Sequence, residues 1–140
     1  MSEVIYAREE RLSVGEYLDV VGHSTLGATR PLADGERIGA MIAHSDLIVS
    51  ARIEGRCVGL ARCLTDFAWV AYCCDLAVHA DFQGRGIGTE LLRTCRQLLG
   101  AGIGIALLSI PEAVGYYDRL ERIGLRRYPH AYWMSRGPDA

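Results

Sequence analysis

The hexapeptide Gln83-Gly84-Arg85-Gly86-Ile87-Gly88 joins a strand-like segment to a helix-like segment. The segment before it, Trp69 to Val78, alternates at a period of two, and one predicted face consists of Val70, Tyr72, Cys74, Leu76 and Val78. The apolar residues after it fall at helical spacing and are Ile87, Leu91, Leu92, Cys95, Leu98 and Leu99. A glycine-rich turn that enters a helix presents free backbone N–H groups and the positive end of the helix dipole to an anion. The hexapeptide therefore predicts a phosphate-binding turn that needs no lysine, and the chain contains no lysine.

Spacing separates the phosphate sites that such a turn can form. A dinucleotide-binding turn that starts at Gly84 requires a third glycine at position 89, which is occupied by Thr89. A nucleoside triphosphate loop requires a lysine. A turn that serves packing alone is an alternative at this stage. The pattern that remains is Gln-x-x-Gly-x-Gly.

Length and charge restrict the class of protein. The 140 residues suit a single domain, residues 1–140, and half of them are hydrophobic, as in a globular protein. A net charge of -2 argues against a nucleic-acid partner, because such partners require a strongly basic face. No apolar run approaches the ~18 residues that span a membrane, and residues 1–10 lack the apolar core of a signal peptide. We therefore expect a cytoplasmic protein without a membrane or nucleic-acid partner.

Cysteine and histidine usage predicts no metal site. The five cysteines form no C-x-x-C pair, and in a reducing compartment they are typical of buried free thiols. Cys73 and Cys74 are adjacent in a predicted strand, so their side chains are expected on opposite faces. The histidines at positions 23, 44, 79 and 130 lack ligand spacing.

Local patterns predict the element order β-α-α-β-β-β-α-β-α-β. A capping box of Ser13 and Glu16 begins the first helix, and Gly124 is the predicted C-cap of the last helix, which Pro111 opens. The predicted strands are residues 3–8, 47–53, 57–64, 68–79, 103–109 and 125–134, with a short helix at 36–44 and a tight hairpin connection at 54–56. This order implies a mixed α/β fold with helices packed on the faces of a sheet.

The stretch from Asp75 to Leu92 resembles the GNAT superfamily of acyl-CoA-dependent N-acetyltransferases. The resemblance covers strand, loop and helix together, and residues 58–62 resemble the third strand of that family. Ala113, followed four residues later by Tyr117, resembles its penultimate helix. The resemblance implies a central mixed, largely antiparallel sheet of six to seven strands with helices on both faces. It also implies an acetyltransferase that uses acetyl-CoA as co-substrate and no metal.

The resemblance implies particular contacts with the co-substrate. The backbone from Gln83 to Thr89, that is Gln83, Gly84, Arg85, Gly86, Ile87, Gly88 and Thr89, would bind the pyrophosphate. Leu76 and Val78 would pair with the pantetheine amides, in a gap between their strand and the strand at 105–109. Ala77 and Ala106 are small enough to be compatible with that gap. The family's asparagine contact falls at Ile110 here, so we expect it to be lost or to pass to Ser109.

The resemblance also implies catalytic roles. The Val78 N–H would stabilise the developing oxyanion, and Tyr117 would donate a proton to the departing thiolate. Relatives often carry a glutamate at the position of Tyr72, which is no base at its ordinary pKa of about 10. Asp75 is the nearest carboxylate and an alternative base, and deprotonation relayed by water is the default. Gly124 follows Tyr117 by seven residues instead of the family's four, as though about one helical turn were inserted.

The sequence does not identify the acceptor. We prefer a small-molecule amine to a protein N-terminus or lysine, because the chain has no added arm to hold a peptide. The aromatic stretch from Tyr128 to Trp133 suits stacking on an aromatic amine, pairing across a homodimer, or filling its own core as an edge strand. A protein that binds acyl-CoA as a sensor without turnover is the alternative from another class.

Overall fold

The structure is a computed structural model that describes residues 2–137. Its helices and strands are β1 (Val4–Arg8), α1 (Val14–Gly22), η1 (Gly27–Thr29), α2 (Gly35–Ala43), β2 (Leu47–Ile53), β3 (Arg56–Thr65), β4 (Val70–Val78), η2 (Ala80–Phe82), α3 (Ile87–Leu99), β5 (Gly104–Leu107), η3 (Pro111–Ala113), α4 (Val114–Asp118) and η4 (Glu121–Ile123). The five strands form one sheet in the order β1-β2-β3-β4-β5. Neighbours are antiparallel except β4 and β5, which are parallel. The expected mixed, largely antiparallel sheet is therefore confirmed.

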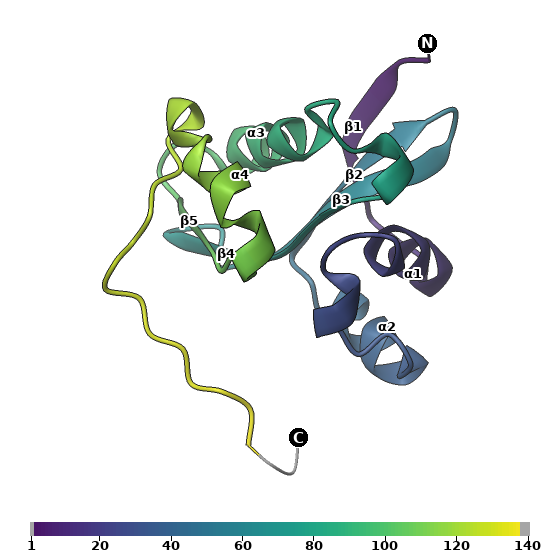
Figure 1. The fold of residues 1–140 in the computed structure, drawn as a ribbon, viewed down its shortest axis with the longest axis horizontal. Helices are drawn as coiled ribbons and strands as arrows, with labels where there is room; N and C mark the ends of the chain where they lie inside the picture. The colour runs from purple at the N-terminus through teal and green to yellow at the C-terminus, as the bar shows by residue number, and fades with distance from the viewer. Residues whose placement is uncertain (1, 138–140) are drawn as a thin grey trace.

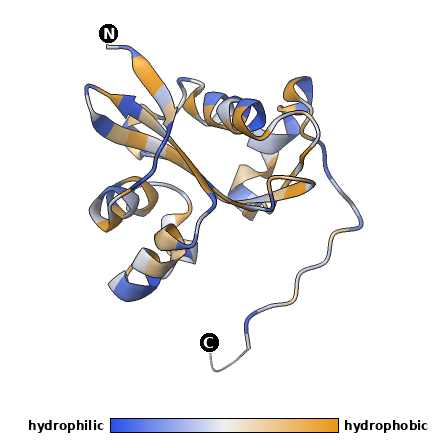
Figure 2. Cartoon of the chain, turned by 180° about the vertical axis from the view of Figure 1, so that it is seen from behind, coloured by the Kyte–Doolittle hydropathy of each residue, from blue (hydrophilic) through white to orange (hydrophobic). Residues whose placement is uncertain are grey.

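Helices cover both faces of the sheet, as expected (Figure 1). On one face, α3 and the tyrosines of α4 pack with β2, β3 and β4 around a core that includes Leu91, Cys95 and Val49. On the other, α1 and α2 pack around Tyr17, Ile38 and Leu60. The central strands are mostly hydrophobic, whereas the outer side of α2 is hydrophilic (Figure 2).

Local sequence signals account for several boundaries. Ser13 Oγ accepts a hydrogen bond from Glu16 N–H at 3.0 Å, and Glu16 Oε1 accepts one from Ser13 N–H at 3.3 Å, which confirms the capping box. Asp34 caps α2, which begins at Gly35, one residue before the predicted start. Glu54 and Gly55 have φ values of 49° and 82°, as a two-residue hairpin between β2 and β3 requires.

The predicted last strand at residues 125–134 is wrong. Residues 126–137 are all exposed and form no helix or strand. In Figure 1 this segment runs away from the sheet without joining another element. Aromatic residues favour strands only when a partner completes the ladder, and Pro129 has no N–H to donate to one. The sheet therefore has five strands among the described residues instead of six to seven.

The last predicted helix is divided into three short pieces. Gly115 lies inside α4, where glycine lowers helix propensity, and α4 spans only five residues. The extra residues before Gly124 form the separate turn η4, which is where the sequence indicated an inserted turn. Gly124 has a φ of 92° and ends that turn in the left-handed conformation, as its predicted role as a C-cap requires.

Candidate active site

Strands β4 and β5 separate halfway along β4. Their last pair is Cys73 with Leu107, so residues 74–78 have no partner strand on that side. The His79 N–H bonds to the Val58 carbonyl of β3 at 2.9 Å. Because peptide groups alternate along a strand, those of Leu76 and Val78 face away from β3, toward the gap. The structure thus contains the expected gap, with a free strand edge along one side.

A β-bulge at Cys74 lies where this gap begins. Arg62 pairs with Asp75 and Cys63 pairs with Cys73, so Cys74 has no partner residue on β3. The extra residue reverses the alternation of side chains. Cys73 packs in the core under α3, whereas Asp75 bonds to Tyr17 of α1 on the other face. The single face predicted from Val70 to Val78 is therefore wrong beyond the bulge, where Leu76 and Val78 join the core on the α3 side.

The glycine-rich turn lies at the end of this free edge. Gly86, with a φ of 78°, is the N-cap of α3 and provides no side-chain cap. The first bond of the helix runs from Glu90 N–H to the Gly86 carbonyl, so the N–H groups of Ile87, Gly88 and Thr89 precede the helical ladder. Gln83 Nε2 donates to the Val78 carbonyl at 2.9 Å and ties the turn to β4. Gly84, with a φ of 79°, and Arg85 are exposed in the same turn. The turn therefore combines free backbone N–H groups with the positive charge of Arg85.

Tyr116 reaches this turn, which the sequence did not indicate. Its hydroxyl lies 3.0 Å from Thr89 Oγ1. A Cβ at Gly88 would lie 2.7 Å from the same hydroxyl, so only glycine leaves room for it. The adjacent tyrosines and Gly88 are the sequence signal for this contact. The spacing from Ala113 instead predicted a role for the neighbouring Tyr117.

Tyr117 is half-buried against the core under α3 and contacts the ring of Tyr116 edge-on at 5.2 Å between centroids. Burial raises the pKa of its phenol well above the ordinary value, and the charge of Arg30 opposes that shift. Tyr117 therefore holds its proton at neutral pH, and the raised pKa makes this phenol a weaker acid than an exposed tyrosine.

Asp75 is placed on the opposite face of β4. It is 1% exposed and accepts hydrogen bonds from Tyr17 Oη at 2.8 Å, Arg62 Nε at 2.6 Å and Arg30 Nε at 2.6 Å. Although burial opposes ionisation, the two guanidinium groups hold the pKa of the Asp75 carboxyl below its ordinary value. This geometry gives the carboxylate a structural role and leaves no path for an amine to approach it.

The remaining predicted residues are dispersed. Ala77 is buried under α1 with its side chain away from the gap, and Ala106 is exposed on β5. Ser109 lies on the far side of the gap, where its Oγ donates to the Ile110 carbonyl. Burial raises the pKa of Tyr72, so this phenol is no base. The structure thus brings together Leu76, Val78 and the turn at residues 83–89, with Tyr116 of α4 in contact with the turn and Tyr117 packed beside Tyr116.

One cluster among the described residues has the composition of a metal site. Ligand atoms of Asp19, His23 and His79 lie within 4.8 Å of one another. His79 Nδ1 accepts from the Asp81 N–H at 3.1 Å, which leaves the proton of a neutral ring on Nε2, the atom that faces Asp19. Hydrogen bonding therefore accounts for the arrangement of His79.

One cavity lies away from these residues. This cavity of about 350 Å³ lies between the β1–α1 connection and α2, and none of its lining residues belongs to β4, the turn or α4.

Within residues 2–137, no helix has the length and apolarity needed to cross a membrane.

Comparison with known proteins shows the family of the chain. Residues 16–121 match the model of the acetyltransferase (GNAT) family. An uncharacterized N-acetyltransferase of Porphyra purpurea is 32% identical over 97 residues, which cover 65% of this chain and 54% of the relative. Serotonin N-acetyltransferase 2, chloroplastic, of Oryza sativa subsp. japonica is 31% identical over 64% of this chain and 48% of its own length. The chain thus spans about half the length of the curated relatives it matches.

Solved structures share the fold. A GNAT-family acetyltransferase of Streptococcus pneumoniae TIGR4 superposes with a TM-score of 0.66 at 20% identity, over 96% of this chain and 100% of that one. An aminoglycoside N-acetyltransferase in complex with CoA gives a TM-score of 0.68 at 16% identity, over 97% and 96% of the two chains. Sequence match and architecture agree, and the chain belongs to the GNAT family of acetyltransferases.

Proposed function

We propose that this protein transfers an acetyl group from acetyl-CoA to a primary amine of a small molecule, by direct attack in a ternary complex. The observation that carries the proposal is the continuity between the free edge of β4 and the N-terminus of α3. The edge offers peptide groups to the amides of pantetheine, and the turn offers N–H groups to the pyrophosphate.

Acetyl-CoA supplies an activated acyl group in the form of a thioester. In this proposal the turn at residues 83–89 holds the pyrophosphate, with Arg85 at its rim. Leu76 and Val78 pair with the pantetheine, and the Val78 N–H donates to the carbonyl oxygen as negative charge develops on it. Ser109 contacts the ligand from the other side of the gap.

Tyr117 is the proposed general acid. The new N–C bond forms as the C–S bond breaks, and the phenolic proton passes to the departing sulfur. Water carries the proton of the attacking amine and restores the phenol, because Asp75 is buried in ion pairs and Tyr72 is a poor base.

A second candidate is an acyl-CoA sensor without turnover. It is favoured by one observation: β4 carries Tyr72 where relatives often carry a glutamate, and its only carboxylate is paired with two arginines.

Two measurements separate the two functions. A thiol reagent follows thiol release from acetyl-CoA across a panel of amines, and calorimetry measures CoA binding. Amine-dependent release supports the transferase. Binding without release for any amine supports the sensor, and failure to bind CoA contradicts both.

We also propose where the protein acts and how it assembles. We place the protein in the cytoplasm as a single-domain enzyme, while two of its relatives bear the word chloroplastic in their names.

Tyr132 and Trp133 are 95% and 54% exposed and form the proposed contact of a homodimer. A single monomeric species in sedimentation experiments at micromolar concentration would contradict the dimer.

A further inference from the structure

The buried ion cluster on β4 is not electrically balanced. Asp75 pairs with Arg30 through Oδ1 and with Arg62 through Oδ2, each at 2.6 Å. Within residues 2–137, neither guanidinium has another carboxylate at ion-pair distance. Tyr17 donates to the same carboxylate and stays neutral, because burial raises the pKa of its phenol. The cluster therefore carries one positive charge in excess.

Arg30 is the member of the cluster that a ligand can reach. The side chains of Asp75, Arg62 and Arg30 are 0%, 8% and 21% exposed, respectively. Arg30 follows η1, in the connection to α2, and donates from Nη1 to Thr29 Oγ1 and from Nη2 to the Cys74 carbonyl, each at 2.8 Å. A guanidinium has five N–H groups. The bonds of Arg30 to Asp75, Thr29 and the Cys74 carbonyl use three of these groups. Two N–H groups remain for a ligand.

The excess charge lies beside the proposed reaction centre. Cys74, whose carbonyl Arg30 holds, is the bulge at which β4 leaves β5. The charge of Arg30 also acts on the phenols of Tyr72 and Tyr117, where it opposes the effect of burial on the pKa. Arg30 therefore lies on the α1 side of the gap, opposite the helix that binds the pyrophosphate in our proposal.

This charge discriminates among amines. In a partly desolvated site, an unbalanced positive charge repels a cationic acceptor and attracts an anionic group, more strongly than in water. A guanidinium is the side chain best suited to bind a carboxylate.

We propose that the acceptor is a primary amine that also bears a carboxylate, as in an α-amino acid, and that Arg30 binds this carboxylate. This inference rests on the proposed acetyltransferase function. It assigns Arg30 to substrate specificity in addition to its ion pair with Asp75.

The test compares acceptors with and without a carboxylate. Thiol release is measured with alanine, with alaninamide and with a polyamine such as spermidine. We expect kcat/KM for alanine to exceed that for each of the others at least ~10-fold, the discrimination that one charged contact provides. Arg30→Gln should raise KM for alanine by about 10-fold or more and change KM for alaninamide by less than about 2-fold.

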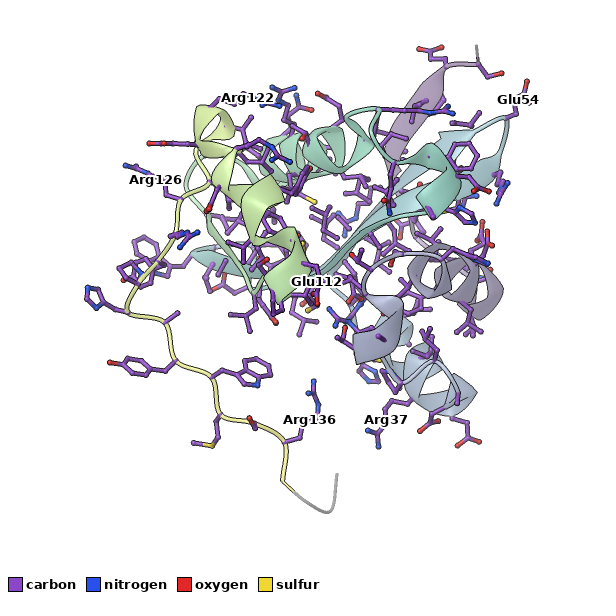
Figure 3. The ribbon with its side chains drawn as sticks, viewed as in Figure 1. Arg37, Glu54, Glu112, Arg122, Arg126 and Arg136 are labelled. Carbon is purple, nitrogen blue, oxygen red and sulfur yellow. The ribbon has the colours of Figure 1, made fainter. Side chains whose placement is uncertain are left out.

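Two variants make the result interpretable. Arg30→Lys keeps the charge and should retain part of the preference, even if Arg30→Gln folds poorly. Arg37→Gln is the matched control, because Arg37 is 52% exposed, pairs with Asp34 and points outward from α2 in Figure 3. We expect it to behave as the wild type.

The outcomes are distinguishable. Equal use of alaninamide or spermidine by the wild type overturns the inference and leaves the transferase function intact. An equal loss with all acceptors in Arg30→Gln also overturns it, since a purely structural role predicts that result. CoA binding without thiol release for any acceptor overturns both the proposed function and this inference.

Discussion

The hydroxyl of Tyr116 lies 3.0 Å from Thr89 Oγ1 and links α4 to the first turn of α3. The contact crosses directly over Gly88, where a Cβ would lie 2.7 Å from the hydroxyl and 3.5 Å from the ring carbon that bears it. The position of α4, and with it that of Tyr117, therefore depends on the absence of a side chain at residue 88.

Gly88→Ala should destabilise the protein by about 1–2 kcal/mol, because overpacking outweighs the higher helix propensity of alanine. Urea unfolding at neutral pH measures this difference. Gly115→Ala is the matched control, since a Cβ there meets nothing within 4 Å, and it should be stabilising by about 0.5–1 kcal/mol.

A double variant identifies the cause. Tyr116→Phe removes the hydroxyl and leaves the nearest ring atom at an ordinary contact distance, so Gly88→Ala should cost much less in that background. If the cost of Gly88→Ala is the same in both backgrounds, the contact between residues 88 and 116 is not its cause.

Asp75→Asn should destabilise the protein by roughly 3–5 kcal/mol, because two guanidinium groups would lose their partner in a buried site. The pKa of Asp75 is lowered in the folded state, so its stabilisation is present above about pH 4 and is lost as the pH falls through the folded-state pKa. The difference between variant and wild type should therefore shrink below pH 4 in urea unfolding experiments.

Asp118→Asn provides the comparison for a surface ion pair. Asp118, at the end of α4, pairs with Arg127 of the exposed segment after η4, and removing this pair should leave the unfolding curve nearly unchanged. An equally small effect of Asp75→Asn would contradict the role that we assign to the buried cluster.

Local sequence signals predicted the parts of the fold that depend on neighbouring residues. The capping box at Ser13, the hairpin at Glu54 and Gly55, and the glycine turn before α3 each depend on residues within a few positions. The turn was predictable because positive φ values at Gly84 and Gly86 require a residue type that the sequence shows directly.

Features that depend on distant residues were not predictable in this way. The bulge at Cys74 follows from the pairing of β3 with β4, and alternation alone cannot reveal an extra residue. Arg30 lies in a connection without periodicity, yet it bonds to β4 forty-five residues away. The segment after Gly124 has strand propensity, but no partner strand pairs with it in the described residues.

Tyr117→Phe should lower kcat by about 10- to 100-fold and leave CoA affinity unchanged, because the general acid acts only in the chemical step. Steady-state kinetics with calorimetric binding measures both quantities. Tyr116→Phe is the comparison on the same helix; because its hydroxyl contacts Thr89 at the turn, it should lower kcat somewhat, but less than Tyr117→Phe does. A larger loss of kcat in Tyr116→Phe would transfer the acid role to Tyr116.

The five cysteines should differ in reactivity. All are free, Cys74 is half-buried and the other four are buried. Burial raises the pKa of Cys57 to about 11 and raises that of Cys74 as well, so these two thiols are mostly protonated at neutral pH. A thiol reagent at pH 8 should label at most one cysteine, Cys74, within minutes and all five after denaturation. Rapid labelling of several cysteines in the folded protein would contradict the packing of the core under α3.

The central claim is that CoA binds at the N-terminus of α3. Gly86→Glu places a carboxylate where the pyrophosphate should lie, and Gly124→Glu is the control, because both glycines are left-handed, with ψ values of 9° and 3°, and leave open space for a Cβ. The direct measurement is calorimetric titration of CoA into the wild type and both variants. We predict binding by the wild type and Gly124→Glu, with a loss of at least ~100-fold in Gly86→Glu, the effect of a like charge against the phosphates. Equal affinity in Gly86→Glu and the wild type, or no binding by the wild type, would contradict the claim.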